Sequence, residues 1–117
     1  MATDLVGNEK LQRFISLLAD LNHQSSQMLK TGDMRLLTPM NDTVEEMFSI
    51  QQSEQEEAYT LIEEDMQAIC MNFNAMVVML KSNEKDTPDN ATVVAVKKFV
   101  RNIFESTVRI VRAYGLV

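Results

Sequence analysis

The feature that most limits the fold of this chain is a stretch of 42 residues, from Met40 to Lys81, without glycine or proline. Only three glycines and two prolines occur among all 117 residues. A β-sheet protein needs many turns, which usually contain these residues, whereas helix interiors exclude proline and disfavour glycine. We therefore predict an all-α protein that forms a single helical-bundle domain over residues 1–117.

Breaker residues divide the chain into three segments with apolar residues at helical spacing. The first helix is expected from about Asn8 to Lys30, because Asn8 can cap its first turn and Gly32 can end it in the left-handed conformation. The last helix is expected from about Pro88 to Tyr114, because proline is well suited to the first helical turn. The β-branched residues of this last helix lower its intrinsic propensity, so we expect burial to hold it in place.

The middle segment favours one continuous helix of about 40 residues, because Gln and Glu in the polar run 51–57 are good helix formers. The fold is then an antiparallel bundle of three long helices. A break near Ser53 is the alternative, since Ser53-Glu-Gln-Glu56 is typical of a capping box, and it gives a four-helix bundle. A continuous helix would be about 60 Å long and would extend beyond the other two by roughly 20 Å.

Such an extension would expose an apolar stripe, and a stripe of this size indicates a partner site. The simplest partner is a second copy of the chain, so we expect a homodimer that forms through the long middle helix. The candidate contact residues are Met40, Val44, Met47 and Phe48.

Methionine is unusually common, with nine residues in the chain. Its flexible side chain is frequent on surfaces that accept varied apolar partners, such as an amphipathic helix of another protein. The candidates in the methionine-rich segment are Met71, Met76 and Met79. The alternative interpretation is that these side chains fill an adaptable core.

The net charge of −6 disfavours nucleic acid as a partner, because phosphate contacts need clustered Lys and Arg. No apolar run approaches the roughly 18 residues of a membrane span, and the N-terminus lacks the features of a signal peptide. Cys70 is the only cysteine, so no disulfide can form within the chain. We expect a soluble cytoplasmic protein that binds no membrane.

The charges are segregated along the sequence. Nine acidic residues and no Lys or Arg occur between Asn41 and Asp65. The last helix is basic on one stripe, which contains Lys97, Arg101, Arg109 and Arg112. Two solvated faces that attract each other weakly explain this pattern, and a docking surface for a charged partner is the alternative.

Catalytic patterns are weak or incomplete in this sequence. His23 is the only histidine, and the Leu-Lys-Gly that follows the histidine in phosphotransfer domains is absent directly after it. Glu54 and Glu57 match half of the Glu-x-x-Glu and Glu-x-x-Asp pattern of all-α nucleotide pyrophosphatases, in which carboxylates hold Mg²⁺. The second half is missing, because Thr87 follows three residues after Glu84.

We therefore predict a small non-enzymatic protein–protein interaction module, such as an adaptor, a regulator or a secretion-type chaperone, without a cofactor. Two alternatives remain open: a Mg²⁺-dependent enzyme that uses Glu54 and Glu57, and histidine phosphotransfer at His23.

Overall fold

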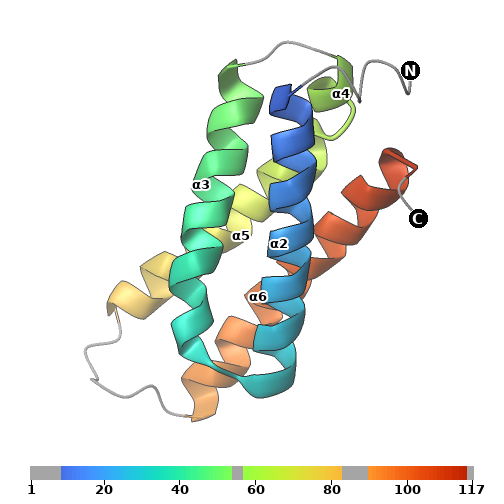
Figure 1. Cartoon of the computed structure of the whole chain (residues 1–117). Helices are drawn as coiled ribbons and strands as arrows, with labels where there is room; N and C mark the ends of the chain where they lie inside the picture. The colour runs from blue at the N-terminus through green and yellow to red at the C-terminus, as the bar shows by residue number, and fades with distance from the viewer. Residues whose placement is uncertain (1–8, 54–56, 83–89, 116–117) are drawn as a thin grey trace.

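The computed structural model describes residues 9–53, 57–82 and 90–115, and the regular structure within these ranges is entirely helical. The elements are α2 (Glu9–Thr31), the 3₁₀ helix η1 (Met34–Leu36), α3 (Leu37–Ser53), α4 (Glu57–Thr60), α5 (Glu63–Ser82) and α6 (Asn90–Ala113) (Figure 1). The all-α prediction is confirmed. None of the helices in the described part of the chain has the length and apolar character needed to cross a membrane.

The end of α2 lies where the sequence places it. Gly32 has a φ of 68°, and its N–H donates to the carbonyl oxygen of Met28 at 2.7 Å. This left-handed residue stops the helix and turns the chain toward η1. Asp33 then caps η1 by accepting a hydrogen bond from the backbone N–H of Arg35 at 3.0 Å. The expected cap at Asn8 lies outside the described residues.

The prediction of one continuous middle helix is wrong. α3 ends at Ser53, and the short α4 is separated from α5 by a turn at residues 61–62. A break near Ser53 was the alternative prediction, based on a capping box that begins at Ser53. In the structure the Ser53 hydroxyl instead donates to the carbonyl oxygen of Ile50 at 2.9 Å, within α3. Because the chain reverses here, α3 and α5 pack against each other in one molecule.

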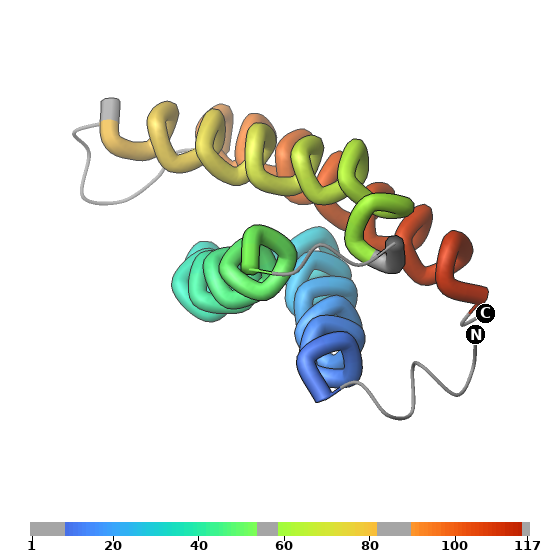
Figure 2. The backbone as a smooth tube through the Cα atoms, turned by 90° about the horizontal axis from the view of Figure 1, so that it is seen from above, coloured from blue at the N-terminus to red at the C-terminus, as the bar shows by residue number. Residues whose placement is uncertain are grey.

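The four longer helices form two pairs. α2 lies beside α3, α5 lies beside α6, and the two pairs cross so that α2 contacts α6 and α3 contacts α5. Figure 2 shows α2 and α3 nearly end-on while α5 and α6 run across them. α4 returns the chain toward the start of α2, where Tyr59 packs edge-on against Phe14 with ring centroids 5.5 Å apart. The molecule is elongated, with principal extents of 49 × 25 × 19 Å.

The core lies between the two pairs and takes side chains from every long helix. Five of the nine methionines are fully buried in it, namely Met28, Met40, Met47, Met66 and Met76. The adaptable-core interpretation therefore holds for these five side chains. α6 packs against both α2 and α5, so its β-branched sequence is held by burial on two sides.

Candidate functional site

A groove runs along the surface between α3 and α5. It consists of two hollows of about 230 and 270 Å³, and both are lined by Asn41 and Phe73, so they adjoin each other. The α3 wall consists of Leu37, Thr38, Asn41, Val44, Glu45 and Phe48, and the α5 wall of Cys70, Phe73, Asn74, Met76, Val77 and Leu80. We call this feature the α3–α5 groove.

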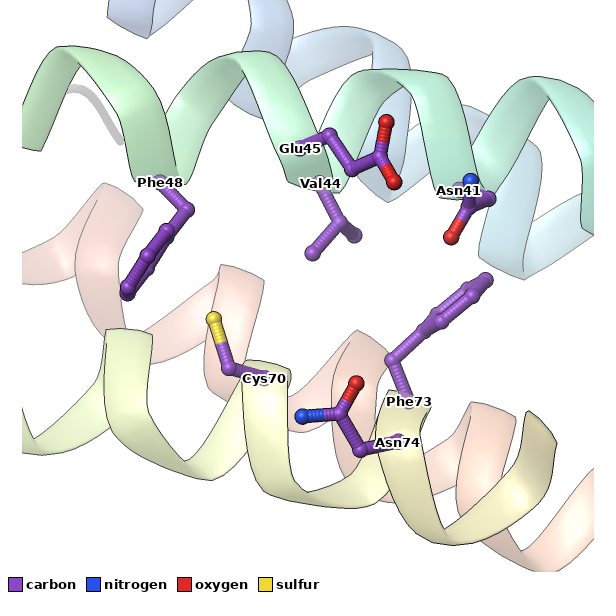
Figure 3. A pocket seen from close by; sticks show the side chains of 7 residues that line it. All are labelled: Asn41, Val44, Glu45, Phe48, Cys70, Phe73 and Asn74. Atoms are coloured by element: carbon purple, nitrogen blue, oxygen red, sulfur yellow. The ribbon is translucent and has the colours of Figure 1, made fainter. Parts of the chain in front are cut away.

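The antiparallel course of α3 and α5 determines the shape of the groove. Phe48 and Cys70 line one hollow, whereas Leu37 and Leu80 line the other. Figure 3 shows Phe48 reaching from α3 toward α5, with the sulfur of Cys70 directed toward α3. From Leu37 to Phe48 the groove follows twelve residues of α3, a length of about 16 Å.

The floor of the groove is apolar. Val44, Phe73 and Met76 are buried and belong to the core, so they form a fixed base. Phe48 lies on the rim with 44% of its surface exposed. Burial raises the pKa of the Cys70 thiol, which keeps the group neutral and makes it part of the apolar lining.

The surroundings of the groove are acidic. Glu45 lines the groove, and α3 contains Asp42, Glu45 and Glu46 but no Lys or Arg. Glu46 faces α2, where the Arg13 guanidinium binds both carboxylate oxygens and holds the pKa of Glu46 below its usual range. Lys81 is the only basic residue of α5. The groove therefore combines an apolar floor with a negative rim.

Most of the residues predicted for the exposed stripe are not on the surface. Met40 and Met47 are fully buried and Val44 is nearly so, because α3 packs against α2 and, after the reversal that follows Ser53, against α5. Phe48 is the exposed member of this set. The structural basis for the expected dimer through a projecting helix is thus absent.

The methionine-rich candidates point in different directions. Met76 is fully buried and forms part of the groove floor, Met79 is half-buried against the core, and Met71 is 69% exposed on the opposite side of α5 from the core. These three side chains do not form one surface.

The residues of the two catalytic alternatives are not brought into a common site. His23 lies exposed on α2. Glu54 and the side chain of Glu57 lie outside the described residues. Within the described ranges, no group of three or more His, Cys, Asp or Glu side chains is arranged to hold a metal ion.

The basic stripe of α6 is partly used within the fold. Arg109 donates to Asp65 of α5 at 2.8 Å, and Lys97 lies beside Gly32. Arg101 and Arg112 are exposed. Among the described residues, the Arg109–Asp65 pair is the one ion pair that joins α5 and α6. At this position the structure agrees with the interpretation that the acidic and basic faces attract each other.

Several groove residues were not singled out from the sequence as partner-binding. Cys70, Phe73, Asn74 and Val77 have the i, i+3, i+4, i+7 spacing of one helix face. This spacing is the signal that could have identified the α5 wall. It does not show that α3 would form the facing wall.

The chain matches no protein-family model, and no curated protein or solved structure was found to be similar to it.

Proposed function

We propose that this protein is a non-enzymatic interaction module that binds an amphipathic helix of another protein in the α3–α5 groove. The observation that carries the proposal is the apolar floor of the two adjoining hollows between α3 and α5, with exposed Phe48 on the rim. Apolar grooves of this kind bind the apolar face of a helix. Binding of a partner helix in a groove is compatible with the role of an adaptor, a regulator or a secretion-type chaperone.

The length of the groove suits a helix of three to four turns. Anchor side chains at i, i+4, i+7 and i+11 span about 16 Å, which matches the length from Leu37 to Phe48. Met76 on the floor is flexible and polarizable, so it can adapt to different anchor side chains.

The charge of the rim supports a basic occupant. Glu45 lines the groove, Asp42 is exposed one turn away on α3, and α3 offers no basic residue. Lys or Arg residues flanking the apolar anchors of a partner helix would face these carboxylates. Complementary charge of this kind speeds association and suppresses wrong partners.

The experiment uses synthetic amphipathic peptides of about 15 residues, with leucine anchors at i, i+4, i+7 and i+11. One peptide carries Lys on its flanks and the other carries Glu. Cys70 reports on occupancy, because it is the only cysteine of the chain and lines the groove. The Lys peptide is expected to slow modification of Cys70 by a maleimide reagent, and the Glu peptide to do so much less.

Variants then test the site. Phe48→Ala is expected to weaken binding of the Lys peptide about tenfold, or about 1.4 kcal/mol, because the rim loses an aromatic contact. Val94→Ala is the matched control, since Val94 is an exposed apolar residue of α6 that does not line the groove. Equal effects of the two substitutions, or no protection of Cys70 by either peptide, would contradict the proposal.

A further inference from the structure

Two large apolar side chains are exposed on the outward side of α5. Met71 is 69% exposed and Val78 is 67% exposed. They are seven residues apart, which places them on one helix face two turns from each other, and the exposed Ala75 lies between them. We call these three residues the α5 ridge.

The α5 ridge is separate from the groove and from the core. None of its residues lines either hollow, whereas Phe73 and Met76 on the other side of α5 are buried. Exposed apolar side chains that cluster on one helix face indicate an interaction surface. The charges at the two ends of α5 indicate which partner fits it.

The two ends of α5 carry opposite charges. Glu63 and Glu64 are exposed in its first turn, and Lys81 is exposed in its last turn. Asp65, the third acid of the first turn, is paired with Arg109 of α6. A helix with this order of charges is complementary to an antiparallel copy of itself.

We propose that the α5 ridge binds the α5 ridge of a second copy, in an antiparallel arrangement about a two-fold axis. An axis that passes between residues 74 and 75 places Met71 of one copy opposite Val78 of the other. Lys81 then lies opposite Ala68 of the second copy, one helical turn from Glu64. The apolar contact between Met71 and Val78 and the charge contact between Lys81 and Glu64 each occur twice, as the symmetry requires.

Other arrangements of two copies are disfavoured by charge. A parallel pair of α5 helices would bring the acidic ends together and the basic ends together. A contact centred between Lys98 and Arg101 of α6 would bring these cations against their own copies. We place the contact on α5, centred on the three ridge residues, none of which lines the groove.

The first measurement is the mass in solution by light scattering or sedimentation across a range of concentrations. The mass is expected to rise from 13.3 kDa toward twice that value with concentration. Met71→Glu is expected to raise the dissociation constant on the order of tenfold or more, because a carboxylate would be buried in the contact. Val94→Glu, at an exposed apolar position of α6, is the matched control and leaves the dimer intact.

A charge exchange tests the antiparallel order. Glu64→Lys and Lys81→Glu are each expected to weaken the dimer, and the chain with both substitutions is expected to recover it. Circular dichroism of each variant confirms that the fold is retained. A mass that stays at 13.3 kDa at every concentration, or a double variant weaker than both single variants, overturns the proposal.

Disulfide trapping tests the register in a Cys70→Ser background. Ala75→Cys lies next to the two-fold axis and is expected to give a disulfide-linked dimer. Gln67→Cys is the control, because two such residues lie about 22 Å apart along an antiparallel pair. Cross-linking at both positions would indicate a parallel pair and would overturn the arrangement. Peptide binding in the groove is measured separately, so the two proposals can fail independently.

Discussion

Single residues determine where the chain turns and how the helices are joined. Gly32 adopts the left-handed conformation that ends α2. Side-chain hydrogen bonds then fix neighbouring helices in register. Asn22 of α2 donates to Thr107 of α6 at 2.9 Å, and Asn102 of α6 donates to Asn72 of α5 at 3.0 Å. Each such bond contributes about 1 kcal/mol, so together they favour the observed register over alternatives.

Replacement of Gly32 by alanine is expected to lower the free energy of unfolding by about 1 kcal/mol. The added Cβ would lie 3.5 Å from the Lys97 side chain, which is an ordinary contact, so the cost is conformational. Urea denaturation measures the change. Gly115→Ala is the control, because Gly115 has the same φ of 68° but follows the last helix and its Cβ would meet nothing within 4 Å. A smaller cost is expected at Gly115, because the chain can relax there without moving a turn between two helices. Equal destabilisation by both substitutions would contradict this expectation.

At the scale of elements, the sides of α5 differ in their surroundings. One side is buried in the core, a second forms a wall of the groove, and a third carries the α5 ridge. Methionine occurs on more than one of them, so the count of methionines alone does not locate a binding surface. Helix geometry assigns each residue to its side, because Met71 and Met76 are separated by about 140° around the axis.

Truncation of a methionine is expected to cost much more stability on the buried side of α5 than on the exposed side. Met76→Ala is expected to destabilise the fold by about 2–5 kcal/mol, because Met76 is fully buried and its loss leaves a cavity. Met71→Ala is expected to change the free energy of unfolding by at most about 0.5 kcal/mol, because Met71 is mostly exposed. Chemical denaturation at high dilution, where the chain is monomeric, measures both values. A large loss of stability in Met71→Ala under these conditions would place Met71 in the core instead.

At the scale of the whole molecule, the reversal after Ser53 determines the architecture. It converts an apolar stripe that a straight helix would leave in water into the part of the core that joins α3 to α5. The groove is a consequence of the same reversal, because its two walls come from α3 and α5, which lie before and after it.

A distance measurement tests the reversal directly. Spin labels at Asn41→Cys and Asn74→Cys, in a Cys70→Ser background, are expected to lie close together because both residues line one hollow. A continuous helix would separate them by about 50 Å. Labels at Thr38→Cys and Ser49→Cys are the control, since both lie within α3 and should be about 16 Å apart along its axis in either fold. A long distance between the labels at residues 41 and 74 would contradict the reversal and support a continuous middle helix.

The sequence alone was sufficient for the class of fold and for the helices at each end of the chain. The scarcity of glycine and proline excludes a sheet protein, and Gly32 ends α2 as predicted, since a left-handed turn is a local property of the backbone. α6 was predicted to be buried, and it packs against two helices. The start of that helix near Pro88 lies outside the described residues.

The course of the middle segment was decided only by tertiary structure. Gln and Glu near Ser53 favour a helix locally by a few tenths of a kcal/mol per residue, and this preference suggested a straight helix. Burial of Met40, Met47 and Met76 in one core stabilises the reversed chain by more, since each fully buried side chain contributes about 1.5–3 kcal/mol. The location of the groove follows from how closely α3 and α5 then approach each other. That distance depends on contacts between residues about 30 positions apart, which helical periodicity does not encode.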